Sequence, residues 1–224
     1  MNTGNGQVLE LILEDGCRYA RIACPPNLVP APGQYLLASD GSDAPLPVPL
    51  FHTDFAPQGF IAAAPPTTIW NPGLDLHLRG PLGRGFSLPL SARKVGLVAF
   101  DDSPACLRGL IQPALKQDAA VVFIGHSAAD NLPDDVEVQP LSALPEILEW
   151  ADYVAFDVRR ENLNMLREQL VKWNLPSAGK GAQFLIRTPV PCGGLAECGA
   201  CAVTLRSEWK LACKNGPVFD WRDL

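Results

Sequence analysis

Long apolar runs and clusters of like charge are both missing from this sequence. No stretch approaches the roughly 18 consecutive apolar residues of a transmembrane helix, so no membrane span is expected. The 224 residues carry 18 Lys and Arg against 24 Asp and Glu, and the basic residues are scattered along the chain. Binding to nucleic acid needs a basic stripe that faces the phosphates, so no nucleic-acid partner is expected.

A leader sequence and a disulfide framework are also missing. The stretch from Met1 to Gln7 lacks the basic and then apolar regions of a signal peptide, which predicts a cytoplasmic location. Thiols stay reduced there, so the seven cysteines do not indicate disulfides. A composition of 47% hydrophobic and 19% charged residues is typical of a globular protein with one large core or two smaller ones.

Helices are not expected in residues 1–92, because proline is frequent there and interrupts them. Short strands are predicted instead. Gln7–Leu13 and Cys17–Ala23 should form a hairpin around the turn signal Asp15-Gly16, and Gln34–Ala38 should be a further strand. Short strands between turns predict a small antiparallel β-barrel for this region.

The pattern changes near Arg93 to strands that alternate with helices. Continuous apolar runs are typical of strands buried on both faces, and apolar residues spaced by three and four predict helices. The expected strands are Val95–Phe100, Ala119–Gly125, Tyr153–Val158 and Gln183–Arg187, and the expected helices are Leu107–Lys116, Leu144–Trp150 and Glu161–Trp173. This alternation predicts a Rossmann-like α/β domain with a parallel sheet over residues 93–187, and hence a multi-domain α+β protein.

Four cysteines lie together in residues 188–224, which we expect to form a small third domain. Their spacing is C-x5-C-x2-C-x11-C over Cys192, Cys198, Cys201 and Cys213. The plant-type [2Fe–2S] pattern is C-x4-C-x2-C with a distant fourth Cys, so the first gap has one extra residue here. The glycines between the ligands allow a loop to wrap closely around a cluster. The spacing therefore predicts one [2Fe–2S] cluster on four thiolates, and the transfer of single electrons.

Other metal centres fit the spacing less well. Structural zinc usually has two C-x2-C pairs, and only Cys198 and Cys201 form one here. The C-x2-C-x2-C-x3-C-P run of a [4Fe–4S] cluster is missing. A Rieske centre needs two histidines, whereas His52, His77 and His126 lie far upstream. Structural zinc and a cysteine loop without metal stay open as alternatives.

With these motifs in view, the chain resembles the electron-transfer subunit of the two-subunit, NAD-linked dihydroorotate dehydrogenase, within the ferredoxin-reductase-like superfamily. The most specific part runs from Cys192 to Phe219, with its C-G, C-x2-C-x-V and C-x-x-G-P-V-F series. Pro32-Gly33-Gln34-Tyr35 and Gly80-Pro81-Leu82-Gly83-Arg84-Gly85-Phe86 look like two further family motifs. The resemblance implies a barrel that binds FAD, an α/β domain that binds NAD(H), and a cluster that passes electrons to a catalytic partner subunit.

The resemblance also implies where FAD would bind. The implied contacts are Pro49, Thr67, Thr68, Gly80, Pro81, Leu82 and Gly83. The family's Arg-Pro-x-Ser signature corresponds to Val48-Pro49-Leu50-Phe51, which lacks the Arg that pairs with phosphate and the Ser that bonds the flavin ring. Arg79 and Arg84 are candidates for the missing cation, although we expect both to be solvated loop residues. The flavin site is therefore eroded.

The nicotinamide loop departs further from the family. In the family, a G-G-G-x-G turn follows the first strand of the α/β domain. In this chain, the corresponding strand is followed by Asp101-Asp102-Ser103-Pro104. Carboxylates at that position repel a pyrophosphate, and this sequence is typical of a helix cap. A later C-G-P motif is replaced by Phe156-Asp157-Val158. Direct binding of NAD(H) is therefore not expected.

Three functions stay open. The first is an electron-transfer subunit with a working [2Fe–2S] cluster and eroded FAD and NAD sites, serving a catalytic oxidoreductase subunit. The second is a complete FAD-containing, NAD(P)H-linked reductase subunit, and the third is a non-catalytic scaffold or regulatory subunit with a structural metal. No catalytic triad or acid–base pair is evident, so no catalytic residue is predicted. A homodimer is a further candidate assembly, although Val218, Phe219 and Trp221 are expected in a core rather than at an interface.

Overall fold

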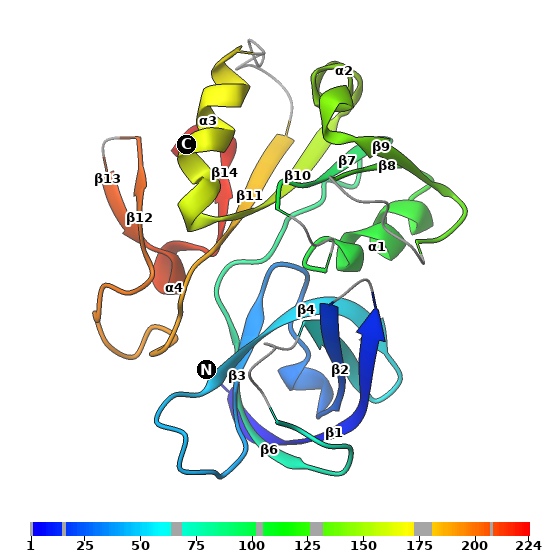
Figure 1. The fold of residues 1–224 in the computed structure, drawn as a ribbon. Coiled ribbons are helices and arrows are strands. Elements are labelled where there is room, and N and C mark those ends of the chain that lie inside the picture. Colours follow the sequence, from blue (N-terminus) through cyan, green and yellow to red (C-terminus); the bar gives the residue numbers. More distant parts are fainter. Residues whose placement is uncertain are drawn as a thin grey trace.

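The computed structural model describes residues 2–14, 17–63, 69–101, 105–125, 132–172, 181–206 and 208–224. A closed β-barrel and a six-stranded sheet make up most of it, and a two-stranded hairpin lies beside the sheet (Figure 1). This arrangement confirms the predicted fold class. Among the helices of the described ranges, none has the length and apolar character that crossing a membrane requires.

Six antiparallel strands close the N-terminal barrel in the order β1-β2-β5-β4-β3-β6. They are β1 (Asn2–Glu14), β2 (Cys17–Ala23), β3 (Tyr35–Ser39), β4 (Val48–Ala56), β5 (Gly59–Ala63) and β6 (Asp75–Leu82). The predicted hairpin is confirmed, because β1 pairs with β2 up to Glu14 opposite Cys17. Its turn, Asp15-Gly16, lies outside the described residues. Side chains such as Leu36 and Phe60 fill the barrel interior.

The second body is a sheet with the strand order β14-β11-β10-β7-β8-β9. Its strands are β7 (Lys94–Ala99), β8 (Ala120–Gly125), β9 (Val136–Pro140), β10 (Tyr153–Arg159), β11 (Gly181–Arg187) and β14 (Val218–Asp220). The four predicted strands are confirmed as β7, β8, β10 and β11. The pairs β8–β7, β7–β10 and β10–β11 are all parallel. The sequence did not predict β9, because this edge strand is short and only Val136 in it is buried.

Helices cover both faces of this sheet (Figure 1). They are α1 (Ile111–Lys116), α2 (Leu144–Trp150) and α3 (Leu163–Lys172), each preceded by a 3-10 turn: η2 (Arg108–Leu110), η3 (Leu141–Ala143) and η4 (Arg160–Asn162). Residues of α1 share a core with Leu97 and Phe123, whereas α2 and α3 pack on the opposite face with Phe156. Pro113 is tolerated in α1 because the first turn of a helix needs no backbone N–H. Trp173, the predicted end of the third helix, lies outside the described residues.

The C-terminal segment adds a hairpin and then returns to the central sheet. β12 (Ala202–Leu205) pairs with β13 (Glu208–Leu211), α4 (Ala212–Asn215) follows, and η5 (Trp221–Asp223) ends the described chain. Between α4 and η5, β14 pairs antiparallel with β11, so that Phe219 lies opposite Phe184. The cysteine-bearing segment is therefore joined to the α/β sheet by a strand of its own.

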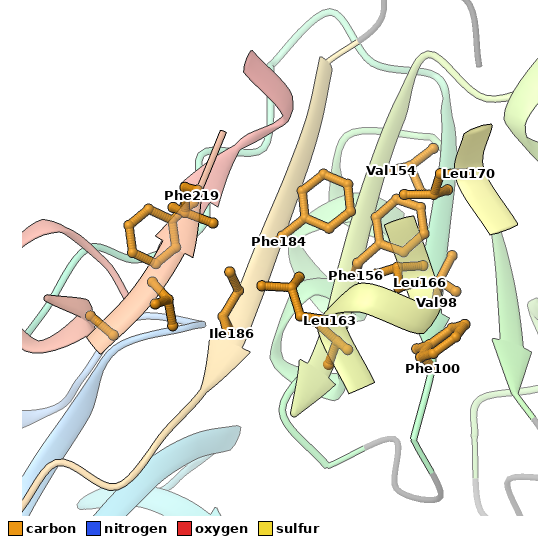
Figure 2. Close-up of a cluster of buried hydrophobic side chains, with 14 of the residues drawn as sticks. Val98, Phe100, Val154, Phe156, Leu163, Leu166, Leu170, Phe184, Ile186 and Phe219 are labelled. Carbon is orange, nitrogen blue, oxygen red and sulfur yellow. The ribbon is translucent and has the colours of Figure 1, made fainter. Parts of the chain in front are cut away.

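Aromatic side chains unite the sheet and the C-terminal segment in one core (Figure 2). The rings of Phe156 and Phe184 stack with centroids 4.5 Å apart, and Trp221 lies 5.6 Å from Phe184. Phe219 is only 1% exposed and belongs to the same core. The prediction that Phe219 and Trp221 pack in a core is confirmed.

We expect Phe219→Ala to lower the free energy of unfolding by about 3–5 kcal/mol, because it removes a fully buried ring and leaves a cavity between β14 and β11. Urea denaturation followed by circular dichroism measures the change. Trp209→Ala is the matched control, because Trp209 on β13 is 65% exposed and its truncation should cost little. A cost below about 1 kcal/mol for Phe219→Ala would contradict its place in the core.

Candidate metal centre

The four C-terminal cysteines come together as two pairs of thiols. The Sγ atoms of Cys192 and Cys198 are 3.7 Å apart, and those of Cys201 and Cys213 are 3.1 Å apart. All four are free of disulfides. Cys201 and Cys213 are buried, Cys192 is half-buried and Cys198 is exposed, so the group extends from the core to the surface.

The β12–β13 hairpin determines the inner pair. Ala202 at the start of β12 is opposite Leu211 at the end of β13. Cys201 directly precedes Ala202 and Cys213 follows Leu211 by two residues, so both are carried to the same end of the hairpin. The backbone N–H of Ala212 donates to the Cys201 carbonyl at 3.0 Å and closes this end. The pairing of two cysteines separated in sequence is thus a consequence of strand register.

The outer pair depends on a tight loop after β11. Gly193 and Gly194 have φ values of +51° and +83°, a backbone conformation that L side chains rarely adopt. A Cβ atom at Gly193 would lie 2.6 Å from Leu37 Cδ1 and 2.7 Å from Arg79 Nη2, so a larger residue would have to displace these side chains of the barrel. Gly193 therefore allows this loop to pack closely against the barrel, a contact that the sequence did not predict.

Two arginines hold the ligand loops through backbone carbonyls. Arg79 on β6 donates from Nη2 to the Cys192 carbonyl at 2.7 Å. Arg160 in η4 donates from Nη1 to the carbonyls on either side of Cys201, those of Ala200 at 2.7 Å and Ala202 at 3.3 Å. The expectation that Arg79 is a solvated loop residue is wrong. Sequence reasoning missed both contacts, because no local pattern links residues so far apart in the chain.

Hydrogen bonding gives the thiols unequal acidity. Burial opposes ionisation of Cys192, but hydrogen bonds with the backbone of Ala196 and Gly194 and with neighbouring thiols outweigh it and lower the pKa of Cys192 to about 7. Burial and the adjacent Cys201 raise the pKa of Cys213 to about 12. A bound metal needs every ligand as a thiolate, so binding at neutral pH releases the proton of Cys213.

Two pairs of thiols are the donor set that a [2Fe–2S] cluster requires, because each of its two irons takes two cysteine thiolates. The residues present therefore fit an iron–sulfur group, which Cys192, Cys198, Cys201 and Cys213 would hold. Such a group supplies one-electron redox chemistry when bound.

The residues implied as flavin contacts lie on neighbouring strands of the barrel. Pro49 on β4 is opposite Leu37 on β3, which is opposite Arg79 beside Gly80 on β6. Thr67 and Thr68 lie outside the described residues. The resemblance sets Phe51 at the position of the family's flavin-binding Ser. Its ring centroid lies 5.3 Å from that of Tyr35, and the ring also packs against Cys106, Leu185 and Val218.

Gly80, Pro81 and Leu82 end strand β6 rather than forming the turn expected of this motif, and Gly83 after them contacts the C-terminal segment. A Cβ atom at Gly83 would lie 2.4 Å from Pro217 Cδ and 2.9 Å from the Gly216 carbonyl oxygen. The next residue, Arg84, donates its backbone N–H to the same carbonyl at 2.6 Å and forms an ion pair with Asp220. Arg79 and Arg84 thus already have partners within the protein, the Cys192 carbonyl and the Asp220 carboxylate.

A buried ion cluster lies where an open α/β sheet usually binds its ligand. The strand order reverses between β7 and β10, and Asp101 and Asp157 lie at the carboxyl ends of these two strands. Arg187 at the end of β11 donates from Nε to Asp157 at 2.6 Å and from Nη2 to Asp101 at 3.2 Å. Asp101 also accepts from the Asn162 side chain and the Arg159 backbone.

This cluster does not fit a dinucleotide, because two buried carboxylates on one guanidinium leave a net negative charge where phosphates would lie. Burial raises the pKa of Asp157, although Arg187 opposes the change. The Asp101 carboxylate accepts from the backbone N–H of Arg159, directly before η4. The residues predicted to cap the helix after this strand are Asp102 or Ser103, with Pro104 in the first turn. Asp102, Ser103 and Pro104 lie outside the described residues.

Residues 192–224 match the family model of the iron–sulfur cluster binding domain of dihydroorotate dehydrogenase B. The chain is similar to a dihydroorotate dehydrogenase electron-transfer subunit. The cysteine segment described above is the part that carries this similarity, since the match begins at Cys192 and includes Cys198, Cys201 and Cys213.

Solved structures match the rest of the chain. A structure of NADH-dependent reduced ferredoxin–NADP oxidoreductase, described for flavin-based electron bifurcation, is 16% identical, has a TM-score of 0.74, and is matched over 97% of this chain and 88% of its own. The ferredoxin reductase of carbazole 1,9a-dioxygenase is 15% identical with a TM-score of 0.59, over 82% of this chain and 66% of its own. A ferredoxin NADP+ reductase from Neisseria gonorrhoeae is 10% identical with a TM-score of 0.59, over 84% and 98%. The fold is therefore ferredoxin-reductase-like.

We expect Arg187→Met to lower the free energy of unfolding by about 3–5 kcal/mol at neutral pH, because it leaves two buried carboxylates without their cation. The folded-state pKa of Asp157 is raised, so protonation favours the folded form and the loss should shrink as the pH falls. Urea denaturation at several pH values measures this.

Arg84→Met is the matched control for that variant. The Arg84–Asp220 ion pair is about half exposed, so its removal should cost under about 1 kcal/mol. Equal losses for the two variants would show that the buried cluster has no special role in stability.

Proposed function

We propose that this chain is an electron-transfer subunit that holds one [2Fe–2S] cluster on Cys192, Cys198, Cys201 and Cys213 and relays single electrons to a catalytic oxidoreductase subunit. The observation that carries the proposal is the arrangement of the four thiols as two pairs, with Sγ–Sγ separations of 3.7 and 3.1 Å. The match of this segment to an iron–sulfur cluster binding domain supports it independently. We place the protein in the cytoplasm, where its other thiols stay reduced.

The exposure of the four ligands supports a relay between proteins. Cys201 and Cys213 anchor the cluster in the core, while Cys198 reaches the surface beside Leu195, which is 68% exposed. Trp209 on β13, at 65%, is a second exposed apolar side chain of the same segment. An exposed ligand with apolar neighbours allows a partner protein to approach closely enough for electron transfer.

The donor in this proposal is a protein rather than NADH. The nicotinamide position holds Asp101, Asp157 and Arg187, and the flavin position holds Phe51 in place of a hydroxyl and Val48 in place of a cation. Neither set of residues supplies the charge-assisted contacts that phosphates need. In this proposal the chain holds the cluster of a reductase and receives electrons one at a time from a donor protein.

Cofactor analysis of anaerobically purified protein tests the proposal. We expect about two iron and two acid-labile sulfide per chain, no stoichiometric zinc, and visible absorption from thiolate-bound iron. Zinc without iron would contradict the electron-transfer role and favour a scaffold with a structural metal. Stoichiometric flavin in the heat extract would favour a complete flavin-containing reductase instead.

We expect Cys201→Ser to lose most of the iron and sulfide, because it removes a buried ligand of the inner pair. Cys24→Ser is the matched control, since Cys24 is half-buried in the barrel core away from the ligand loops. Iron and sulfide per chain are measured for both. Retention of a full complement of iron by Cys201→Ser would contradict its assignment as a ligand.

We further expect dithionite, but not NADH, to bleach the visible absorption of the isolated protein under argon. The physical reason is the repulsion between dinucleotide phosphates and the carboxylates of Asp101 and Asp157. Spectra recorded before and after each reductant provide the measurement. Bleaching by NADH alone would show that the nicotinamide site works in spite of its ion cluster.

A further inference from the structure

Tyr35 lies fully buried where the barrel meets the cysteine-bearing segment, with 0% of its surface exposed. It is the first residue of β3 and is flanked by Phe51 on β4 and Leu82 on β6. Side chains alternate along a strand, so Leu36 faces the barrel interior while Tyr35 faces outward. The outward side is the core that also contains Cys201 and Cys213.

The ring edge of Tyr35 points toward the end of the ligand loop. A Cβ atom built on Gly83 would lie 3.3 Å from Tyr35 Cε1 and 2.9 Å from the carbonyl oxygen of Gly216, which follows α4. Burial raises the pKa of the Tyr35 hydroxyl, and negative charge on Cys213, Cys201 and Cys192 adds to the effect. The hydroxyl therefore stays protonated within electrostatic reach of three of the four ligands.

This hydroxyl has no hydrogen-bond partner among the described residues. Leaving a buried donor unpaired costs about 1–3 kcal/mol, and folded proteins seldom do so. The same core contains Cys201 and Cys213, two of the four thiols that would hold the cluster. An iron–sulfur cluster brings inorganic sulfides and thiolate sulfurs, all of which accept hydrogen bonds.

We propose that the Tyr35 hydroxyl donates a hydrogen bond to a sulfur atom of the bound cluster and thereby makes the cluster easier to reduce. The inference rests on the proposed function, because it requires the cluster. Reduction adds one electron, delivered by a donor protein or by dithionite, and no bond to Tyr35 forms or breaks. The added charge makes the sulfurs better acceptors, so the hydrogen bond stabilises the reduced cluster more than the oxidised one.

Tyr35→Phe tests this role, because it removes only the hydroxyl. We expect the ratio of reduced to oxidised cluster at a fixed potential to fall about three- to tenfold, which is about 30–60 mV for a one-electron couple. Potentiometric titration followed by electron paramagnetic resonance measures the ratio. Resonance Raman spectra in H2O and D2O should also show a smaller isotope shift of the iron–sulfur stretches in the variant.

Tyr19→Phe is the matched control. Tyr19 is another buried tyrosine of the barrel, on β2, and its charged neighbours are Cys17, Arg108 and Glu14 rather than the cluster ligands. Its loss should leave both the potential and the isotope shift unchanged. An equal shift in the two variants, or no shift in Tyr35→Phe, would overturn the proposal.

A second measurement covers the case in which Tyr35→Phe folds poorly. Incorporation of 3-fluorotyrosine in a Tyr19→Phe background keeps the ring and makes the hydroxyl a stronger donor. The remaining tyrosine, Tyr153, donates to Gln183 at 2.8 Å and lies on β10. We expect the potential to become more positive, and an unchanged or more negative value would overturn the proposal.

Iron and sulfide content distinguishes failure of the proposed function from failure of the proposed role of Tyr35. If wild-type protein holds no cluster, the proposed function fails and Tyr35 has no sulfur to bind. If the cluster is present at full occupancy in wild type and in Tyr35→Phe, and the potential and isotope shift are the same, only the role of Tyr35 fails.

Discussion

The antiparallel pairing of β14 with β11 anchors the metal-binding segment at both of its ends. The chain leaves β11 at Arg187, passes through all four cysteines, and returns as β14, where Val218 lies opposite Leu185. The segment is thus a loop closed at its base by backbone hydrogen bonds. This pairing offsets the entropic cost of bringing the two ends of the loop together. The aromatic core of Phe184, Phe219 and Trp221 lies directly over this base.

Contacts from the other two parts of the protein complete the ligand loops. The barrel contributes Arg79, which binds the backbone carbonyl of Cys192, and the α/β domain contributes Arg160, which binds the carbonyls on either side of Cys201. Holding a loop by its carbonyls leaves the thiols and the inward backbone amides available to the cluster. The barrel therefore has a structural role at the metal centre that does not depend on flavin. Tyr35, on the same side of the barrel, adds an effect on the redox potential of the cluster in our proposal.

The ion cluster at the reversal of strand order occupies the place where an open α/β sheet usually binds its ligand. An empty crevice at this place would expose the polar ends of β7 and β10. Arg187 bridges Asp101 and Asp157 there, and Asp101 also satisfies the start of η4. A charged network of this kind is stable only as a complete set, since removal of one partner leaves buried charge. The same network that closes the crevice also repels phosphate.

The sequence by itself determined the order of the barrel, the α/β domain and the cysteine segment, because proline density, apolar runs and cysteine spacing are local signals. It also predicted four cysteines as metal ligands and indicated that Asp101 departs from a phosphate-binding loop. Only the tertiary structure showed that β14 joins the central sheet, that Arg79 binds the Cys192 carbonyl, and that Arg187 joins Asp101 to Asp157. Each of these contacts joins residues far apart in the chain, and no periodicity or spacing within a short window carries that information.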